Sequence, residues 1–349
     1  MSVFSAPDFA DHEQVVFAAD PASGLRAVIA IHDTTRGPAL GGCRMWRYAG
    51  EQDAVADALR LSRGMTYKSA LAELPFGGGK AVVIGDPSHG KSEALWKALG
   101  RAVERLGGRY ITAEDVGTAV PDLEIVRRVT RHVAGIAEGG AGDPSPATAF
   151  GVFMGMKAAV RHRLGGDGLD GLRVAVQGLG HVGLGLATHL AEAGAKLTVT
   201  DIDPARVEGA VRRFGATAVA PSRIHAVDAE VFAPCALGAV LDDQTIPQLR
   251  AVVIAGSANN QLAEARHGAT LARRGVLYAP DYAINAGGII NVAHEATRTG
   301  RPYDRQVAFA HVARIHDTLA TIFEIADAEK IPTSAAADRL AEQRLSAAA

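Results

Sequence analysis

Cysteine is scarce in this chain. Cys43 and Cys235 are the two cysteines among 349 residues, and they lie far apart in the sequence. Their spacing matches no metal-binding pattern, and the twelve histidines form no His-x-x-x-His pattern and no His/Cys cluster. The sequence therefore predicts no metal site and two buried free thiols in a reducing compartment.

Long apolar runs and an excess of charge of one sign are also missing. No 18 apolar residues follow one another, so we expect no transmembrane helix. The first residues include early acids and lack the apolar core of a signal peptide. The formal net charge of -2, without a polybasic or strongly acidic run, argues against nucleic acid or a membrane as partner. We therefore expect a cytoplasmic protein that acts on small molecules.

The composition itself is that of an ordinary globular protein, with 48% hydrophobic and 21% charged residues. A chain of 349 residues is long enough for about two domains with substantial cores. In the first half, strand patterns at 25–32, 81–84 and 110–112 alternate with helical patterns at 51–65 and 92–106. This alternation predicts an α/β fold.

The most informative motif is Gly178-x-Gly180-x-x-Gly183, which follows the apolar run 173–177 and opens a helical pattern. Gly178 would make a tight turn, Gly180 would let the backbone approach a pyrophosphate, and Gly183 would let the helix lie close to the strand. The helix N-terminus would favour the phosphates. A second strand ends at Asp201, where a carboxylate would bind both ribose hydroxyls and disfavour a 2′-phosphate. The motif therefore predicts bound NAD.

A dense turn cluster at 139–146 is the best candidate for a domain boundary. We expect residues 1–138 to form a substrate, catalytic and oligomerisation domain, with C-terminal helices at about 325–349 packing back against it. Residues 139–324 would form a doubly wound, Rossmann-type NAD-binding domain. The two domains would enclose a cleft, as ligand sites between domains commonly do.

Two lysines in the first half are candidates for chemistry. Lys80 follows three glycines and immediately precedes an apolar strand, and Lys68 lies twelve residues upstream. A phosphate-binding P-loop is excluded, because it would need Gly at Leu74 and Ser or Thr at Ala81. Lysine is usually a solvated surface charge. Here the glycines would permit close backbone approach to a ligand, which favours a functional lysine.

Several segments together resemble the amino acid dehydrogenase family, which interconverts amino acids and 2-oxo acids with NAD(P). The resemblance is greatest to its leucine and valine members and extends in family order from position 41 to position 292. The glycine turn of residues 178–183 is one matching segment. The others are Gly41–Met45, Gly64–Lys68, Pro75–Lys80, Ala113–Thr118, Ser145–Val152, Ala255–Leu262 and Ala279–Gly288.

The resemblance implies a catalytic division of labour. Lys68 would hold the substrate α-carboxylate as a point-charge donor. Lys80 would polarise the reacting carbonyl and act as acid and base toward water at Cα, while Asp115 would pass protons to and from the amino group. Glu114 is a rival to Asp115, but adjacent strand residues point to opposite faces and the family pattern favours Asp115.

The resemblance also implies an apolar substrate pocket. Leu40 precedes the Gly41–Gly42 pair, at a position where glutamate-specific relatives carry a lysine that pairs with the side-chain carboxylate. An aliphatic side chain cannot replace that partner, so glutamate is a poor substrate. The other positions that match the side-chain pocket are apolar as well: Met65, Ala113, Ile289 and Val292. They favour a branched-chain amino acid, although each is also a common core residue.

Thr148, Asn259 and Asn285 match family positions that approach the nicotinamide, and Asn259 also approaches the substrate. Thr148 could instead cap a helix, and Asn259 could be a turn residue. The family implies NAD-dependent, reversible oxidative deamination of leucine, valine or isoleucine to the 2-oxo acid and ammonia, by a homo-oligomer. Two alternatives stay open: a phenylalanine dehydrogenase with the same mechanism, and a non-catalytic NAD-binding sensor.

Overall fold

The computed structural model describes residues 3–136, 140–166, 168–295 and 303–348. The chain divides into two compact units. Unit 1 contains Met1–Asp143, Val292–Arg305 and Ala341–Ala349, and unit 2 contains Pro144–Asn291 and Gln306–Leu340.

The domain boundary expected between 138 and 139 lies outside the described residues. The C-terminal helices at about 325–349 were expected to pack against the first domain. In the structure, residues up to Leu340 belong to unit 2, and the segment Ala341–Ala349 belongs to unit 1. Among the described residues, no helix combines the length and the apolar character needed to cross a membrane.

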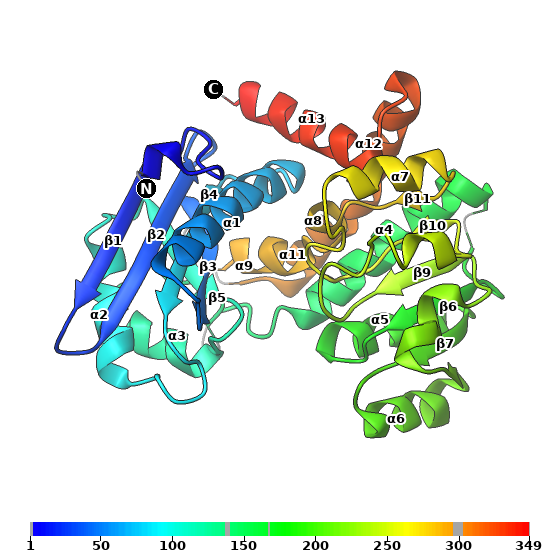
Figure 1. Cartoon of the computed structure of the whole chain (residues 1–349), viewed down its shortest axis with the longest axis horizontal. Coiled ribbons are helices and arrows are strands. Elements are labelled where there is room, and N and C mark those ends of the chain that lie inside the picture. The colour runs from blue at the N-terminus through cyan, green and yellow to red at the C-terminus, as the bar shows by residue number, and fades with distance from the viewer. Residues whose placement is uncertain (1–2, 137–139, 167, 296–302, 349) are drawn as a thin grey trace. The chain divides into compact units, whose positions relative to one another are not determined.

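Unit 1 is built on a five-stranded sheet (Figure 1). The strand order is β1-β2-β4-β3-β5. Strands β1, β2 and β4 pair antiparallel, and β3 pairs parallel with both β4 and β5. The elements of this part of the chain are η1 (Val3–Ser5), β1 (Gln14–Asp20), β2 (Leu25–Asp33), β3 (Ala39–Trp46), α1 (Glu51–Leu71), β4 (Gly77–Ile84), α2 (Glu93–Glu104), β5 (Tyr110–Glu114) and α3 (Val120–Arg127).

The core of unit 1 follows from the two-residue period of strand β2. Its odd-numbered residues from Leu25 to Ile31 join the apolar cluster that contains Leu99 of α2, whereas Val28 joins the cluster that contains Leu59 of α1. Helices α1 and α2 therefore cover opposite faces of the sheet. Complete burial of a leucine such as Leu99 contributes about 1.5–3 kcal/mol.

Glycines 77–79 lie within strand β4, which begins four residues before the predicted strand. A Cβ atom on Gly77 would lie 1.8 Å from the Asp33 carbonyl oxygen, and one on Gly78 would lie 2.1 Å from the Thr66 amide nitrogen. A Cβ on Gly79 would lie 2.7 Å from the ring of Tyr110. The interpretation that these glycines admit a ligand is therefore wrong on the side where a Cβ would project, because protein atoms fill that space.

Unit 2 contains a six-stranded sheet in the order β11-β10-β9-β6-β7-β8, and all its strand pairs are parallel. If these strands are numbered in chain order with β6 as the first, the sheet read from β8 has the 3-2-1-4-5-6 order of dinucleotide-binding folds. The strands are β6 (Arg173–Gln177), β7 (Lys196–Thr200), β8 (Thr217–Ala218), β9 (Val231–Pro234), β10 (Val253–Ile254) and β11 (Leu277–Tyr278). The predicted α/β class, with two domains and a doubly wound parallel sheet, is confirmed.

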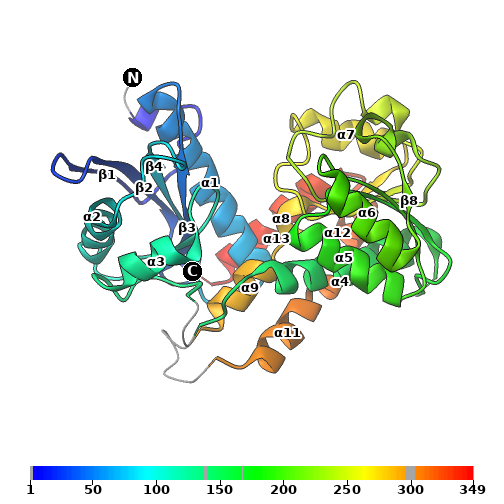
Figure 2. The same cartoon turned by 90° about the horizontal axis from the view of Figure 1, so that it is seen from below.

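Helices accompany this sheet, and α4 packs against both α5 and α12 (Figure 2). The helices from residue 145 onward are α4 (Ser145–Leu164), α5 (His181–Glu192), α6 (Pro204–Phe214), η2 (Pro221–Ala226), η3 (Ile246–Gln248), α7 (Arg266–Arg273), α8 (Asp281–Ile284), α9 (Gly287–Ala293), α11 (Arg305–Ala313), α12 (Ile315–Glu329) and α13 (Thr333–Ser346). Strands β7 and β8 lie on one side of β6, and β9, β10 and β11 lie on its other side. The topological switch point, where the strand order reverses, therefore lies between β6 and β9. The glycine turn follows β6 at this point.

Candidate active site

Lys80 and Asp115 form an ion pair in unit 1. Lys80 lies on β4, Asp115 follows the end of β5, and the Lys80 Nζ atom lies 2.7 Å from Asp115 Oδ2. Strand β3 runs between the two, and a Cβ on Gly42 of that strand would lie 2.7 Å from the Asp115 Cβ. The absence of a side chain at Gly42 therefore gives Asp115 room beside the strand.

The pair is largely withdrawn from water, since the Lys80 side chain is 5% exposed and that of Asp115 is 19% exposed. Burial by itself would raise the pKa of Asp115. The positive charges of Lys80 and Arg44 outweigh burial, so the net shift lowers the pKa of the carboxyl. Asp115 is therefore ionised at neutral pH and can accept a proton. The neighbouring Glu114 is exposed, and the carboxylate that meets Lys80 is that of Asp115.

Other predicted substrate residues of unit 1 lie on the adjoining elements. Lys68 and Met65 are half-buried and three residues apart on α1, which places them on one face of that helix. A Cβ on Gly41 would lie 3.3 Å from Met65 Cγ and 1.7 Å from the Gly79 carbonyl oxygen. Gly41 therefore allows β3, β4 and α1 to meet closely.

Leu40 and Ala113 complete the predicted pocket residues of the sheet. Leu40 is 2% exposed and pairs with Gly78 on one side and Ile111 on the other. Ala113 is half-buried on β5 and pairs with Gly42. The structure thus brings Lys80, Asp115 and the predicted residues of β3 and β5 into one part of the sheet.

Helix α9 carries the two remaining pocket residues. Ile289 is half-buried and belongs to unit 2, whereas Val292 is buried and belongs to unit 1. The division between the units passes between Asn291 and Val292 of this helix.

Asn259 and Asn285 of unit 2 lie together. The Asn285 side-chain amide donates hydrogen bonds to Asn259 Oδ1 at 2.7 Å and to the Ser257 carbonyl at 3.1 Å. Asn285 is buried and Asn259 is exposed, so the inner amide orients the outer one. Thr148 lies in the first turn of α4, where its hydroxyl donates to the Pro144 carbonyl at 3.0 Å. Thr148 does not cap the helix, because the N-cap residue is Pro144.

The three glycines of the nucleotide motif differ in what surrounds them. Gly178 has a φ of +95°, and its amide donates to the Thr200 carbonyl at 2.8 Å. A Cβ on Gly183 would lie 2.0 Å from the Gly178 carbonyl oxygen. Gly180 is the N-cap of α5, and the nearest atom to a Cβ there is Arg206 Nη1, at 4.0 Å. The chain therefore leaves open space at Gly180, beside the N-terminus of α5, where the first amides of a helix lack intrahelical partners and suit a phosphate.

Asp201 lies directly after β7 with 7% of its side chain exposed. Its carboxylate accepts hydrogen bonds from the Leu179 amide at 2.6 Å and from the Asp203 amide at 2.9 Å. Arg206 Nη1 lies 3.9 Å from the same group. Asp201 therefore joins the end of β7 to the glycine turn, a structural role in addition to the predicted contact with ribose.

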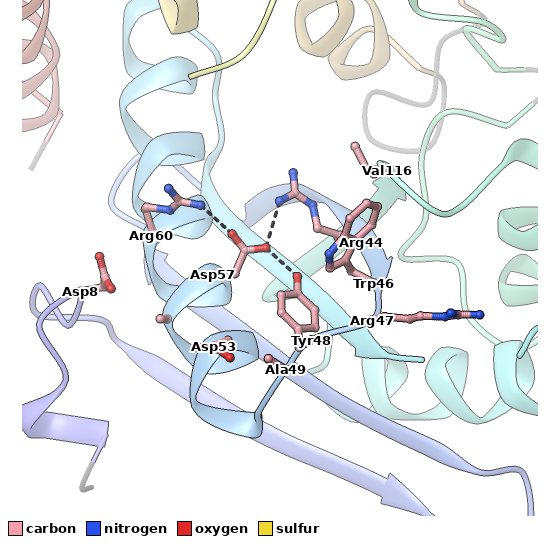
Figure 3. Close-up of a pocket in the computed structure, with 11 residues that line it drawn as sticks. Asp8, Arg44, Trp46, Arg47, Tyr48, Ala49, Asp53, Asp57, Arg60 and Val116 are labelled. Atoms are coloured by element: carbon pink, nitrogen blue, oxygen red, sulfur yellow. Dashed lines mark hydrogen bonds and ion pairs between the residues drawn. The ribbon is translucent and has the colours of Figure 1, made fainter. Parts of the chain in front are cut away.

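A pocket of about 600 Å³ in unit 1 includes Arg44 in its wall (Figure 3). Sequence reasoning missed this pocket, because its residues come from separate segments. Arg44 also binds Asp115, with its Nε atom 3.0 Å from Oδ2. The lining residues are Asp8, Arg44, Trp46, Arg47, Tyr48, Ala49, Asp53, Ala56, Asp57, Arg60 and Val116.

Sequence reasoning also missed Glu295, a buried carboxylate of unit 1. It accepts hydrogen bonds from the amides of Gly135 at 2.8 Å, Ala141 at 2.9 Å and Ile136 at 3.1 Å. Burial raises the pKa of Glu295 despite these bonds. No local pattern marks this residue, since its partners lie more than 150 positions earlier in the chain.

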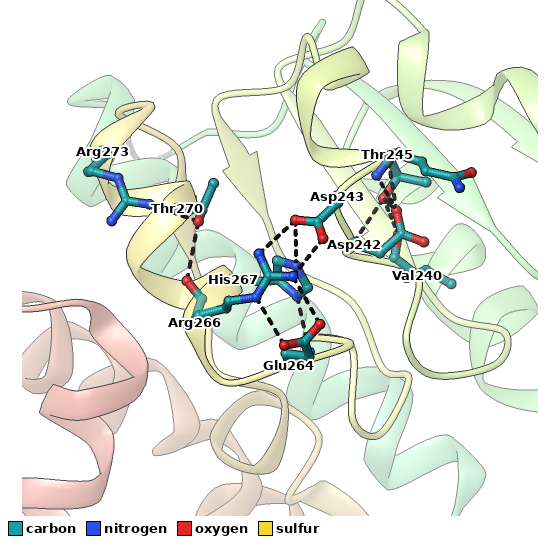
Figure 4. A network of polar contacts seen from close by, with 10 residues as sticks. Val240, Asp242, Asp243, Thr245, Glu264, Arg266, His267, Thr270 and Arg273 are labelled. Carbon is teal, nitrogen blue, oxygen red and sulfur yellow. Dashed lines mark hydrogen bonds and ion pairs between the residues drawn. The ribbon is translucent and has the colours of Figure 1, made fainter.

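An acidic and histidine cluster lies in unit 2, where Asp243, Glu264 and His267 bring ligand-type atoms within 4.8 Å of one another (Figure 4). The guanidinium of Arg266 binds both carboxylates, at 2.5 Å from Asp243 and 2.9 Å from Glu264. The Glu264 amide donates to His267 Nδ1 at 3.0 Å. Arg266 therefore supplies the positive charge of this cluster, which ties the start of α7 to the preceding loops.

Comparisons with known proteins agree with this arrangement. A family profile described as Glu/Leu/Phe/Val dehydrogenase, dimerisation domain, matches residues 12–132. A second, described as Glutamate/Leucine/Phenylalanine/Valine dehydrogenase, matches residues 139–208 and 199–349. Leucine dehydrogenase of Geobacillus stearothermophilus is 55% identical over 347 residues, which cover 99% of this chain and 94% of the relative. Valine dehydrogenase of Streptomyces virginiae is 51% identical, with 97% and 95% covered.

Solved structures give the same result. The crystal structure of L-tryptophan dehydrogenase from Nostoc punctiforme matches with a TM-score of 0.85 at 47% identity and covers 97% of both chains. A glutamate dehydrogenase from Thermus thermophilus shares the fold, with a TM-score of 0.80 at 24% identity and coverage of 97% and 89%. These findings confirm the resemblance inferred from the motifs: the chain belongs to the glutamate/leucine/phenylalanine/valine dehydrogenase family of oxidoreductases.

Proposed function

We propose that this enzyme catalyses the reversible, NAD-dependent oxidative deamination of L-leucine, L-valine and L-isoleucine to the 2-oxo acids and ammonia. The observation that carries the proposal is the buried ion pair between Lys80 and Asp115, at 2.7 Å. It combines a proton acceptor with a cation, and both are withdrawn from water. Relatives named leucine and valine dehydrogenase, at 55% and 51% identity, support the reaction class.

The chemistry assigns a task to each residue. Lys68 holds the substrate α-carboxylate, and ionised Asp115 accepts a proton from the substrate ammonium group. Bound NAD supplies the acceptor for the hydride that leaves Cα. Water then attacks the resulting iminium carbon beside Lys80, and the proton that the water loses passes through Lys80 to solvent. Asp115 returns its proton to the nitrogen, ammonia leaves with the electron pair of the C–N bond, and the hydroxyl proton passes back to Asp115, so that the 2-oxo acid remains.

The apolar character of the predicted pocket supports an aliphatic substrate. Leu40 is buried within the sheet and offers no partner for a substrate carboxylate, so glutamate would lose the solvation of its charge without compensation. Pockets discriminate one methylene by about 1–3 kcal/mol, so we expect all three branched-chain amino acids to react.

The glycine turn of unit 2 fits NAD. Open space at Gly180 gives a pyrophosphate access to the amides at the start of α5. The Asp201 carboxylate at the end of β7 favours the two ribose hydroxyls of NAD over the 2′-phosphate of NADP. The positive charge of Arg206, 3.9 Å from Asp201, reduces this discrimination without removing it.

The test is NADH formation at alkaline pH with L-leucine, L-valine, L-isoleucine, L-phenylalanine, L-tryptophan and L-glutamate, each repeated with NADP. L-tryptophan belongs in the panel because a relative named L-tryptophan dehydrogenase is 51% identical to this chain. Branched-chain preference with NAD supports the proposal. Preference for an aromatic substrate keeps the mechanism and refutes the pocket assignment, whereas NAD binding without turnover of any substrate indicates a sensor.

Variants of the ion pair test the mechanism itself. We expect Asp115→Asn and Lys80→Met to lower kcat by roughly 10²- to 10⁴-fold, because each removes a group that moves or stabilises a proton. The matched control is Lys91→Met, which breaks the 2.6 Å ion pair between Lys91 and Asp122 in the same unit. Wild-type kcat in both Lys80→Met and Asp115→Asn would refute the assigned roles.

We also propose that the enzyme is a cytoplasmic homo-oligomer. The profile matched by residues 12–132 is described as a dimerisation domain, and the Thermus thermophilus structure is described as hetero-hexameric. Light scattering of the purified protein after size-exclusion chromatography measures the assembly. A mass equal to one chain of 36.2 kDa at micromolar concentration would refute the oligomer.

A further inference from the structure

We propose that Arg44 is a positioning residue that holds the Asp115 carboxylate for proton transfer, and that Asp57 and Tyr48 fix the guanidinium of Arg44 in place. This inference rests on the proposed function, because it assigns the partner of a catalytic carboxylate. It extends the site from the Lys80 pair to the wall of the pocket in Figure 3.

The inner contact joins Arg44 to Asp115. Arg44 lies on β3, between β4 with Lys80 and β5, which Asp115 follows, and its Nε atom donates to Asp115 Oδ2 at 3.0 Å. The Lys80 Nζ atom meets the same oxygen at 2.7 Å. Lys80 must also serve the reacting oxygen of the substrate, whereas Arg44 has no such second task. Arg44 can therefore keep the carboxylate oriented and charged while Lys80 serves the substrate.

The outer contacts orient Arg44 itself. Its Nη1 atom donates to Asp57 Oδ2 at 2.9 Å, and the Tyr48 hydroxyl donates to the same oxygen at 2.6 Å. Arg60 donates to the other oxygen, Asp57 Oδ1, at 2.9 Å. Figure 3 shows Asp57 at the centre of these contacts, with Arg44, Tyr48 and Arg60 around it. Because Arg44 spans two carboxylates with a planar guanidinium, its orientation is set at both ends.

Burial gives these contacts their weight. The Asp57 side chain is 10% exposed and that of Arg44 is 19% exposed, so water does little to screen them. Burial alone would raise the pKa of Asp57, but the hydrogen bonds from Tyr48 and Arg60 and the charge of Arg44 lower it. Burial and the bond to Asp57 raise the pKa of Tyr48, so its hydroxyl remains a donor.

Other groups near Asp115 do not replace Lys80 and Arg44 in keeping its carboxylate charged. The thiol of Cys43 on β3 is buried, which raises its pKa to about 12 and keeps it neutral. Arg47 and Arg60 of the pocket are each paired with a carboxylate, Arg47 with Asp86 and Arg60 with Asp57. The pocket wall is therefore better explained as support for Arg44 than as a site for an anion.

The first experiment compares kcat and KM across pH for the full-length wild type and Arg44→Met. We expect KM for L-leucine to change little and kcat to fall roughly 10- to 100-fold. The acidic limb of kcat/KM should move up by about one pH unit, because Asp115 loses one of two cations that favour its charged form. Arg44→Lys should restore part of the pH profile but not kcat, since an ammonium cannot span both carboxylates.

Two further variants separate positioning from simple stability. Tyr48→Phe should shift the acidic limb in the same direction by less, because it acts only through Asp57. Arg47→Met is the matched control: it removes another pocket arginine, one that pairs with Asp86, and should leave the profile unchanged. If Arg44→Met does not fold, Tyr48→Phe and Arg44→Lys carry the test.

A titration that does not depend on activity completes the design. Carbon-13 carboxyl NMR of aspartate-labelled protein, assigned with Asp115→Asn, measures the Asp115 pKa in the wild type and in the Arg44 variants. An unchanged Asp115 pKa, together with an unchanged acidic limb, overturns the inference about Arg44. A different pair of results would separate the two proposals. If the Asp115 pKa is raised in Arg44→Met but the wild type turns over no amino acid, the proposed function is refuted and the role of Arg44 is retained.

Discussion

The two glycine-rich segments of this protein look alike in sequence and differ in the structure. In the segment 77–79 of unit 1, a Cβ on any residue would meet protein atoms within 2.7 Å. In the motif of unit 2, Gly178 and Gly183 are likewise enclosed by the chain, but Gly180 is open. The first segment packs protein against protein, whereas the second leaves one position free for a ligand.

The comparison shows that glycine marks close approach without saying what approaches. The Thr66 backbone of α1 lies so close to Gly78 that no side chain would fit there. The glycine therefore allows α1 to pack tightly on β4. Only the surroundings of a glycine distinguish this case from the case of Gly180. Substitutions that add a single methyl group therefore separate the two, by their effects on stability and on binding.

The largest expected effect is that of Gly78→Ala. The added Cβ would lie 2.1 Å from the Thr66 amide nitrogen, so the backbone must move, and we expect the free energy of unfolding to fall by about 3 kcal/mol or more. Urea unfolding measures it. The control is Gly64→Ala in helix α1, where nothing lies within 4 Å of the added Cβ and a gain of about 0.5–1 kcal/mol is expected. Equal stability of the two variants would refute the packing explanation.

Gly183→Ala and Gly180→Ala should have different effects on stability and on NAD binding, although both residues belong to the same glycine motif. The Cβ on Gly183 would meet the Gly178 carbonyl at 2.0 Å, so we expect a loss of about 1–3 kcal/mol. Gly180→Ala should change stability by less than about 0.5 kcal/mol and weaken NAD binding roughly tenfold, by occupying the space for the pyrophosphate. Calorimetric NAD titration of both variants decides, and full NAD affinity in Gly180→Ala would contradict the assignment.

Asp201→Asn tests the acidic end of β7 with a smaller expected effect. Asparagine keeps an oxygen for the Leu179 amide but removes the charge, so the turn should remain folded. We expect the ratio of kcat/KM for NAD over NADP to fall about tenfold, or roughly 1.4 kcal/mol. Asp203→Asn is the control, because asparagine caps α6 as well as aspartate does. An unchanged ratio in Asp201→Asn would remove Asp201 from cofactor selection.

The smallest effect is expected from His32, a half-buried histidine that contacts α1. Burial first, and then the charge of His12, lower the pKa of His32 from 6.5 to about 4, and its Nδ1 atom lies 2.8 Å from Thr66 Oγ1. The folded protein thus keeps His32 neutral while the unfolded chain protonates it below pH 6.5. The stability that this gives is present above pH 6.5 and is lost as pH falls toward 4.

His32→Asn should therefore be less sensitive to acid than the wild type. Between pH 7 and pH 5, the free energy of unfolding should fall less in the variant, whatever its value at pH 7. Comparing the two proteins cancels the opposite contributions of carboxyls such as Glu295, whose pKa is raised in the folded state. His225→Asn is the control, because it replaces a half-buried histidine of unit 2 whose Nε2 atom lies 3.2 Å from Gln248 Oε1. Parallel pH curves for His32→Asn and wild type would rule out this role.

Local pattern was sufficient for much of the fold. The apolar runs predicted strands at 25–32 and 110–112, and the structure has β2 at Leu25–Asp33 and β5 at Tyr110–Glu114. Helix α1 was predicted to end at 65 and extends to Leu71. Its final residues are held by packing against β4, which outweighs the low helix propensity of Gly64. The start of β4 was missed for the related reason that glycine is depleted in strands.

The candidate site also contains residues that the sequence predicted and residues whose role only the structure shows. Lys80 and Asp115 were predicted from the family pattern, and the structure places them 2.7 Å apart. Arg44 lies within the family segment Gly41–Met45, but nothing in the sequence marked it as a partner of Asp115. Its partners Asp57 and Tyr48 come from α1 and the segment that precedes it, and no local period connects them.

The sequence by itself therefore determined the α/β class, the nucleotide-binding turn and the family, because these depend on short motifs and on local apolar periodicity. Only the tertiary structure decided which glycines face protein and which carboxylate receives two cations. The physical reason is strand order: β3 lies between β4 and β5, although β4 and β5 follow it in the chain. Pairing across this order brings Lys80, Arg44 and Asp115 together, and no neighbouring residues in the sequence record that meeting.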